Sequence, residues 1–313
     1  MNNYSFGLVL LAGLSGICMS LIGIAFRIGQ NRSVIPLHIS MCMGLAGAVF
    51  FGVQMNWGDF RELPLFVWIM VLLVTAGSIG AMHLVRICLG MGPLSPLWSA
   101  MNLTFLPVVL YSAVTFGEQI NVTSYAALAA AIICVVFASQ IGGESDSEDE
   151  ATPHRSLRTK AIYAGLLLLV LLCNSLVFIF IKDLGTRTVT INSDATYLTR
   201  YLAPIYFLMY ISLAVFSGLT AWIQRAVPNR YVDLVWLGAL AASGSITGLL
   251  LLKICIPLPA ALVFTINGMI TILGGVVASV IFFGESLKPA WYGTVGFGLL
   301  AVFLANLDKL LSM

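Results

Sequence analysis

The stretch FFGESLKPAWYG (282–293) stands near the end of the chain, and TFGEQINVTSYA (115–126) closely resembles it. Each stretch contains Phe-Gly-Glu and has a tyrosine seven positions after the glutamate, which is Glu285 in one and Glu118 in the other. Long apolar runs precede and follow both stretches. The repetition indicates that two related segments of the chain approach their ends at these turns.

Composition sets the class of protein. The 313 residues are 60% hydrophobic and 9% charged, with a net charge of +2 and a mean hydropathy of +1.01. Soluble proteins contain about 25% charged residues, so the chain is predicted to be a polytopic membrane protein. No basic block interleaved with aromatic residues favours nucleic-acid binding. No P-loop, aspartate-rich metal motif or catalytic His/Asp/Ser cluster occurs, and we therefore expect no enzyme, cofactor or metal site.

Ten apolar runs are long enough to cross a membrane, since about 20 residues make one helical crossing. Helices are expected because a helix satisfies its backbone hydrogen bonds within itself. The expected spans cover residues 5–26, 35–54, 65–89, 94–116, 122–140, 160–182, 195–222, 232–253, 257–283 and 289–307.

A polar segment divides the spans into two groups of five. Residues 142–159 contain five acidic residues followed by basic ones, a composition typical of a solvated linker. We therefore expect a first five-helix repeat over 1–141, a linker over 142–159 and a second five-helix repeat over 160–313.

Internal similarity supports this division. Arg-Ile-Cys at 86–88 and Lys-Ile-Cys at 253–255 each begin 32 residues before a Phe-Gly-Glu glutamate, and they are 167 positions apart. Cys-Met-Ser-Leu at 18–21 resembles Cys-Asn-Ser-Leu at 173–176, which lies 155 positions later. The difference of 12 fits an insertion between the sixth and seventh spans. Because five is odd, the second half must enter the membrane from the opposite side, which predicts an inverted-topology repeat.

These features resemble the drug/metabolite transporter superfamily, EamA-like branch. The resemblance rests on the five-plus-five arrangement, on Gly-Glu before the last helix of each half, and on a basic residue near the end of the third helix of each half, in Leu-Val-Arg-Ile (84–87) and Leu-Leu-Lys-Ile (251–254). It implies an all-α polytopic membrane protein with ten transmembrane helices as two inverted repeats around a central cavity. It also implies secondary transport by alternating access in the bacterial inner (cytoplasmic) membrane.

Charged groups inside spans need a reason, since one at a helix centre costs about 2.5–3.5 kcal/mol. His83 and Arg86 share a helix face and are candidates for binding an anionic group. Arg86 has the alternative of reaching the membrane edge. His38 and His83 are candidates for a coupling proton, although His38 can also lie at the membrane interface. Arg200 and Tyr201 are candidates for binding a carboxylate or phosphate, or for an interfacial aromatic belt.

Amides inside apolar runs form a second group of candidates. Asn102, Asn174 and Asn267 can each contact substrate or hydrogen-bond a neighbouring helix. Trp98 can form a cavity wall or can simply pack. The Phe-Gly-Glu glutamates Glu118 and Glu285 have a different expected role, because a carboxylate before a helix accepts hydrogen bonds from its free N–H groups.

No acidic residue falls in the middle of an expected span, so the expected substrate is a small anionic or zwitterionic metabolite such as an amino acid or organic acid. A lipid or lipid-linked precursor flippase and a multidrug exporter remain alternatives. Proton or sodium coupling, and a monomer or a homodimer in the lipid bilayer, are left open. The 15 Lys and Arg residues divide nine to six between the two sides. That count favours both termini outside, whereas the resemblance implies cytoplasmic termini, so import and export both remain open.

Overall fold

A computed structural model describes residues 6–91, 94–117, 122–141, 157–191, 195–225, 231–255, 260–284 and 289–311. Within these ranges the chain forms twelve helices and no strand. The helices are α1 (Phe6–Asn31), α2 (Pro36–Gln54), α3 (Trp57–Arg61), α4 (Leu65–Met91), α5 (Leu94–Met101), α6 (Phe105–Phe116), α7 (Val122–Ile141), α8 (Leu157–Ile191), α9 (Ala195–Ile223), α10 (Tyr231–Ile254), α11 (Ala260–Phe283) and α12 (Pro289–Leu311).

Helices follow the apolar runs of the sequence. Each expected range holds one helix, except the fourth, which is divided between α5 and α6. Proline opens both α2, at Pro36, and α12, at Pro289, as suits a first helical position whose N–H has no partner within the helix. The short helix α3 is an element that the apolar pattern does not predict. It begins where the Asn56 side-chain oxygen accepts a hydrogen bond from the Gly58 N–H at 3.0 Å.

The boundary of the expected linker needs a correction. Helix α8 begins at Leu157, so residues 157–159 belong to a helix and not to the linker. Residues 142–156, which carry the acidic run, lie outside the described residues. Glu118 and Glu285 also lie outside them, and their expected role stays a prediction.

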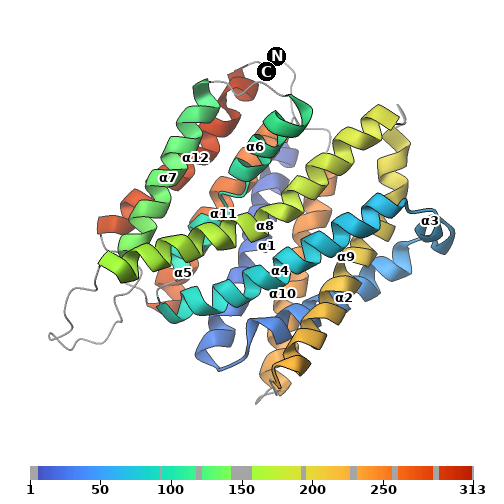
Figure 1. The fold of residues 1–313 in the computed structure, drawn as a ribbon, viewed down its shortest axis with the longest axis horizontal. Coiled ribbons are helices and arrows are strands. Elements are labelled where there is room, and N and C mark those ends of the chain that lie inside the picture. Colours follow the sequence, from blue (N-terminus) through green and yellow to red (C-terminus); the bar gives the residue numbers. More distant parts are fainter. Residues whose placement is uncertain are drawn as a thin grey trace.

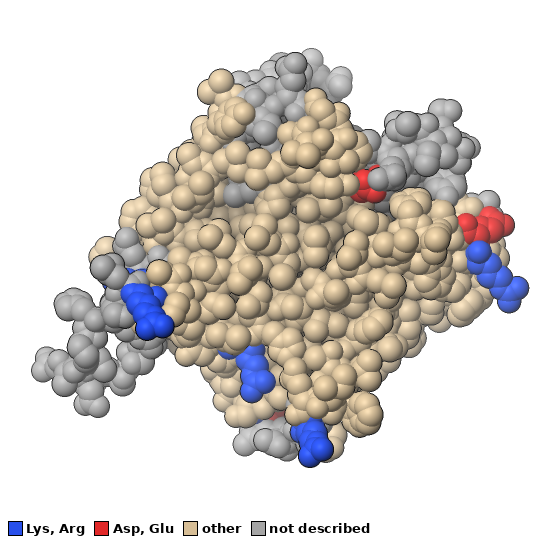
Figure 2. Space-filling view, viewed as in Figure 1, with Lys and Arg blue, Asp and Glu red and all other residues tan. Residues whose placement is uncertain are grey.

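The chain is an integral multi-pass membrane protein. In the described part of the chain, seven helices are long and apolar enough to cross a membrane. They cover Gly7–Asn31, Pro36–Gln54, Leu65–Met91, Arg158–Phe180, Tyr201–Ile223, Tyr231–Leu252 and Ile266–Phe283. Large apolar side chains are exposed on these helices and their neighbours, with Val114 at 88% and Val53 at 84%. Figure 2 shows a face that is largely uncharged, with charged side chains near its margins. The count of ten spans stays a prediction.

The helices form a bundle in which α4 and α8 lie side by side in front, and α1 packs against α10 and α11 behind them (Figure 1). Two further pairs, α2 with α9 and α7 with α12, make the most extensive contacts between the two halves. Helix α1 begins and α12 ends at the same end of the bundle.

The contacts are related when the halves are exchanged. Gly77 of α4 packs against the carbonyl oxygen of Cys173 of α8, and Gly244 of α10 packs against the carbonyl oxygen of Cys18 of α1. The two glycines are 167 positions apart and the two cysteines 155 positions apart, which are the offsets of the sequence repeat. The α1–α10 contact is therefore the counterpart of the α8–α4 contact. The opposite orientation of the halves across a membrane stays a prediction.

The two Phe-Gly-Glu stretches end their helices in the same way. Gly117 follows α6 with φ 66°, and Gly284 follows α11 with φ 62°. A positive φ is readily adopted by glycine and costly for residues with a side chain, and a left-handed residue is a common helix terminator. The glycine of each stretch therefore sets the end of the helix.

Small residues let the last helices of the two halves approach each other. The ring of Phe137 on α7 lies over Gly293 of α12 and is stacked on Phe297, with ring centroids 5.7 Å apart. The thiol of Cys134 donates to the Thr294 carbonyl oxygen at 3.1 Å. Gly293, Cys134 and Thr294 therefore take part in a contact between α7 and α12 of the same chain.

Candidate functional site

A break in the fourth expected span is the central feature of the candidate site. Helix α5 ends at Met101, residues 102–104 form a turn, and α6 begins at Phe105. Proline has no N–H, so Pro107 cannot donate to the carbonyl oxygen of Leu103, four residues earlier. Helix α5 packs against α7 of its own half and against α8, α11 and α12 of the other half. The break thus lies where the two halves meet.

Two predicted amides lie at this break. The Asn102 side-chain N–H₂ donates to the Trp98 carbonyl oxygen at 2.8 Å, and the Asn174 side-chain N–H₂ on α8 donates to the Met101 carbonyl oxygen at 3.3 Å. Both residues are half-buried. The Asn174 amide gives a donor to a carbonyl group in the last turn of α5, where the helix has no further N–H to offer. The Trp98 carbonyl oxygen accepts from the Asn102 main-chain N–H as well, at 3.2 Å. The structure therefore brings together Asn102 and Asn174, which are 72 positions apart in the sequence.

Trp98 packs one turn before Asn102. It is 6% exposed, and its ring fills the space above Gly23 of α1 and Gly275 of α11. A Cβ added to Gly23 would approach the ring to 2.7 Å, and one added to Gly275 would overlap the indole. The indole nitrogen has no hydrogen-bond partner among the described residues. Of the two readings of Trp98, this geometry favours packing over a cavity wall.

Asn267 has a different position. Its side-chain N–H₂ on α11 donates to the Ser15 hydroxyl at 3.0 Å, and that hydroxyl donates to the Gly248 carbonyl oxygen at 2.9 Å. The chain of bonds joins α11, α1 and α10. Asn267 is half-buried, and its hydrogen bond to Ser15 links α11 to α1.

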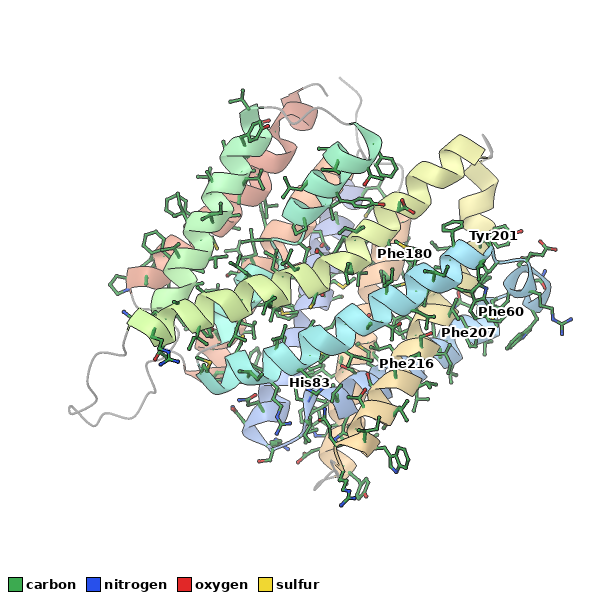
Figure 3. The ribbon with its side chains drawn as sticks, in the orientation of Figure 1. Phe60, His83, Phe180, Tyr201, Phe207 and Phe216 are labelled. Atoms are coloured by element: carbon green, nitrogen blue, oxygen red, sulfur yellow. The ribbon has the colours of Figure 1, made fainter. Side chains whose placement is uncertain are left out.

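The predicted cationic and aromatic residues lie toward opposite ends of the bundle (Figure 3). Tyr201 lies near the start of α9, is buried, and donates through its hydroxyl to a Glu62 carboxylate oxygen at 2.9 Å. His83 lies in the last third of α4, where its Nε2 is 3.1 Å from the Gln224 side-chain nitrogen. The structure therefore does not bring Tyr201 and His83 into one site.

The remaining predicted residues divide by burial. Arg86 is exposed, which agrees with the alternative of a side chain at the membrane edge. His38 is 4% exposed in the first turn of α2, so the alternative of interface exposure does not hold. The side chain of Arg200 lies outside what the structure describes.

A separate small pocket opens between α2, α9 and α10. Its cavity volume is about 30 Å³, and it is lined by Phe51, Gln54, Leu202, Ala203, Tyr206, Leu249 and Leu250. The Phe51 ring contacts Tyr206 at a centroid distance of 5.1 Å and stacks on Tyr210 at 5.6 Å. The Gln54 amide and the Tyr206 hydroxyl are the polar side-chain groups of this otherwise apolar lining.

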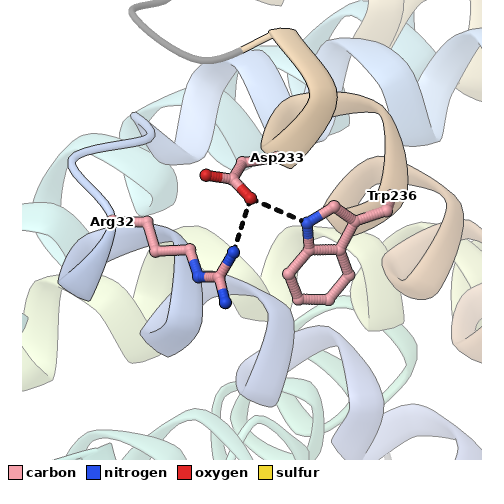
Figure 4. A network of polar contacts seen from close by, with 3 residues as sticks. All are labelled: Arg32, Asp233 and Trp236. Carbon is pink, nitrogen blue, oxygen red and sulfur yellow. Dashed lines mark hydrogen bonds and ion pairs between the residues drawn. The ribbon is translucent and has the colours of Figure 1, made fainter.

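Asp59 is buried, at 6% exposure, and two further buried carboxylates were likewise not singled out by sequence reasoning. Asp183 on α8 is 2% exposed and accepts a hydrogen bond from the Tyr111 hydroxyl at 2.8 Å. Asp233 is 8% exposed and accepts hydrogen bonds from Arg32 at 2.6 Å and from the Trp236 indole at 3.0 Å (Figure 4). The signal for the second was local, because Trp236 lies three residues after Asp233 on one face of α10.

Comparison with known proteins finds a solved structure with a similar fold. No protein-family model and no curated protein matches the chain. A solved structure described as "Crystal structure of protein" is similar to it, with a TM-score of 0.58, 14% sequence identity and coverage of 96% of each chain. At this identity the likeness shows a shared fold over nearly the whole length.

Proposed function

We propose that this protein is a secondary transporter that moves a small polar metabolite by alternating access, and that the break between α5 and α6 is part of its substrate site. The observation that carries the proposal is the pair Asn102 and Asn174, which lies half-buried at a broken helix between the two halves. Polar groups within membrane helices are costly and tend to mark substrate pathways. Transporters built from inverted repeats place their sites at discontinuous helices between the repeats.

The paired contacts of the halves support alternating access. Because α1–α10 and α8–α4 are counterparts, the bundle contains two related groups of helices that can exchange arrangements around one site. Exchanging the halves turns α2 into α9 and α7 into α12, so each of these two pairs corresponds to itself. Both pairs would lie near the axis of such a movement. Membership of the EamA-like branch belongs to the same proposal.

The expected substrate class is a zwitterionic or anionic metabolite, such as an amino acid or organic acid. A cationic drug needs a free carboxylate as counter-charge. The buried carboxylates of Asp183 and Asp233 already accept hydrogen bonds, from Tyr111 in one case and from Arg32 and Trp236 in the other. Their engagement favours a substrate that carries its own negative charge.

His83 is the proposed coupling residue. The Gln224 side-chain nitrogen lies 3.1 Å from Nε2 of His83, and the amide donates to Nε2 in the tautomer in which that ring nitrogen is the acceptor. A proton on that nitrogen would remove the acceptor, and with it this link between α4 and the turn that follows α9. His83→Gln should therefore abolish stimulation of transport by a proton gradient while leaving counterflow in place. His38→Gln is the comparison for the second predicted histidine.

Flux measurement tests the function directly. Purified protein in proteoliposomes should exchange at least one labelled solute from a panel of amino acids, organic acids and phosphorylated metabolites. Asn102→Ala and Asn174→Ala should reduce that flux, whereas Ser243→Ala should not, because the exposed Ser243 hydroxyl only donates within its own helix, to the Leu240 carbonyl oxygen. If well-folded protein transports none of the solutes in this panel, the proposal is wrong.

A second candidate is export of amphipathic compounds, including drugs and lipid-linked precursors. The observation that favours it is the pocket lined by Phe51, Leu249 and Tyr206, because apolar and aromatic walls suit such compounds. The two candidates separate in one competition assay. Amphipathic dyes should displace the labelled metabolite only if the second candidate is correct, and Phe51→Ala should then weaken that displacement.

A further inference from the structure

We propose that the short helix α3 and the aromatic side chains around it lie in the headgroup layer of the bilayer and hold one end of the bundle at the membrane surface. The inference does not depend on the proposed transport function, because it concerns only how the chain meets lipid. The aromatic patch consists of Trp57 and Phe60 of α3, Trp68 of α4 and Phe207 of α9.

Phe60 lies at the centre of the aromatic patch. Its ring makes edge-to-face contacts with Trp57, Trp68 and Phe207, at centroid distances of 6.0, 5.3 and 5.5 Å. Trp57 and Phe207 also contact each other at 5.7 Å. Such ring pairs add stability beyond the burial of apolar area. The rings therefore fasten α3 to α4 and α9, and they hold Trp57 in one place although 59% of it is exposed.

The aromatic patch lies where the lipid-facing surface of α4 ends. The exposed apolar residues of α4 that lead away from the patch are Leu65, Ile69, Leu72 and Leu73. No charged residue occurs on α4 before its last third. Beside the patch, in the connection from α2 to α4, the exposed residues Asn56 and Arg61 are polar. Tryptophan is enriched where hydrocarbon meets water, because its ring is apolar and its N–H is polar. A rigid aromatic patch between an apolar and a polar surface therefore fits the headgroup layer.

The opposite end of α4 and α9 has a matching boundary. Trp222 in the last turn of α9 is 76% exposed, and the exposed Arg225 follows it. On α4, Arg86 is exposed, and it stands 18 residues after Trp68, which is about 27 Å of helix. That length is close to the hydrocarbon thickness of a bilayer, roughly 30 Å. Figure 3 shows Phe60 and Phe207 together beside the start of α9, and His83 farther along α4, toward the opposite end. The two boundaries are therefore about one bilayer apart.

Depth-dependent fluorescence quenching tests this inference on the full chain in phosphatidylcholine vesicles. Wild type is compared with Trp57→Phe, which keeps a ring in the patch, so the difference between the two spectra is the emission of Trp57. A spin label is carried either on the lipid headgroup or near the end of an acyl chain. We expect the headgroup label to quench the Trp57 emission about twofold or more strongly than the deep label, as suits a ring at the interface. Trp222→Phe makes the same comparison at the opposite boundary, with the same expected result.

Two further variants calibrate the measurement. Val215→Trp places a ring at an exposed position midway between Phe207 and Trp222 on α9, and the deep label should quench it more strongly. The emission lost in Trp98→Phe should respond to neither label, because Trp98 is 6% exposed. Stronger quenching of Trp57 by the deep label would overturn the inference.

The other possible surroundings of Trp57 give distinct results. Quenching by aqueous iodide without a response to either lipid label would place the aromatic patch in water and overturn the inference. Protection of Trp57 from iodide and from both lipid labels would also overturn it, because a second copy of the chain would then cover the patch.

Discussion

Gly244 of α10 lies against the main chain of α1, where a Cβ added to it would come within 2.5 Å of the Cys18 carbonyl oxygen. Gly77 of α4 stands in the same relation to Cys173 of α8, at 2.9 Å. The serines two positions after these cysteines also match, because Ser20 and Ser175 each donate to the carbonyl oxygen three residues earlier at 2.7 Å. The sequence offsets of 155 and 167 residues therefore relate two equivalent helix contacts, one between α1 and α10 and the other between α8 and α4.

Close approach at these glycines predicts a loss of stability. Gly244→Ala and Gly77→Ala should each lower the free energy of unfolding by about 1–3 kcal/mol, because the neighbouring atom is a main-chain oxygen that moves only with its helix. The measurement is the thermal unfolding midpoint of the purified protein in detergent. Gly165→Ala on α8 is the matched control, since no atom lies within 4 Å of a Cβ there. The control should be neutral or gain about 0.5–1 kcal/mol, and equal effects at all three positions would contradict the contact.

The backbone conformation at the ends of α6 and α11 predicts a loss of stability when the glycine there is replaced. Gly117 and Gly284 have positive φ, and nothing lies within 4 Å of a Cβ at either position. Gly284→Ala should therefore cost about 1–2 kcal/mol through the left-handed conformation without any clash. Gly284→Asn should cost less, because asparagine tolerates this region better. Thermal midpoints in the order Gly, Asn, Ala are expected, and the reverse order of Asn and Ala would exclude this explanation.

Packing of Trp98 predicts a coupled pair. Gly275→Ala should destabilise the protein, because the added methyl group overlaps the indole. Trp98→Leu in the same chain should recover part of that loss, which a double-mutant cycle measures. Trp98→Phe alone should lie within about 1 kcal/mol of wild type, because the smaller ring is offset by the loss of a buried N–H that has no partner among the described residues. Additive losses in the double variant would contradict direct contact.

The hydroxyl of Ser15 joins three helices, and its removal takes one hydrogen bond from each of two groups. Ser15→Ala should cost about 1–3 kcal/mol, because the Gly248 carbonyl oxygen and the Asn267 N–H₂ lose a hydrogen bond in a buried place. Ser243→Ala is the control, since its exposed hydroxyl bonds only within its own helix. Chemical or thermal unfolding of both variants makes the comparison, and similar midpoints would contradict the three-helix link.

In the network of Arg32, Asp233 and Trp236, removal of the arginine and removal of the aspartate should cost different amounts of stability. The Arg32 side chain is 46% exposed and that of Asp233 only 11%. Arg32→Ala should therefore cost at most about 1 kcal/mol, as is usual for exposed ion pairs, and its effect should shrink in high salt. Asp233→Ala should cost more, because it also leaves the Trp236 indole N–H without an acceptor. Unfolding at two salt concentrations separates the two contributions.

Helix positions and helix ends could be predicted from the sequence, because they depend on local properties. Apolar length places the helices other than the short α3, proline favours the first turn of α2 and α12, and glycine ends α6 and α11. The prediction of an all-helical membrane chain is confirmed. The division of the fourth span also has a local sign in Pro107, although that residue alone does not show that the turn at 102–104 is stabilised by an amide from α8.

The environment of each polar residue was decided by tertiary structure. A helix of apolar residues carries little information about which face turns inward, because nearly every face is compatible with lipid. Packing of α5 and α8 brings Asn102 and Asn174 together, whereas packing of α11 on α1 turns the Asn267 amide toward Ser15.

By itself the sequence determined an apolar helical chain, its division into two similar halves and the glycine turns that end α6 and α11. These depend on hydrophobicity and backbone conformation, which act over a few residues. Only the tertiary structure decided that Gly244 meets Cys18, that His83 and Tyr201 lie toward opposite ends, and that two amides share one broken helix. The physical reason is that rotation and pairing of helices depend on close packing between segments far apart in the chain.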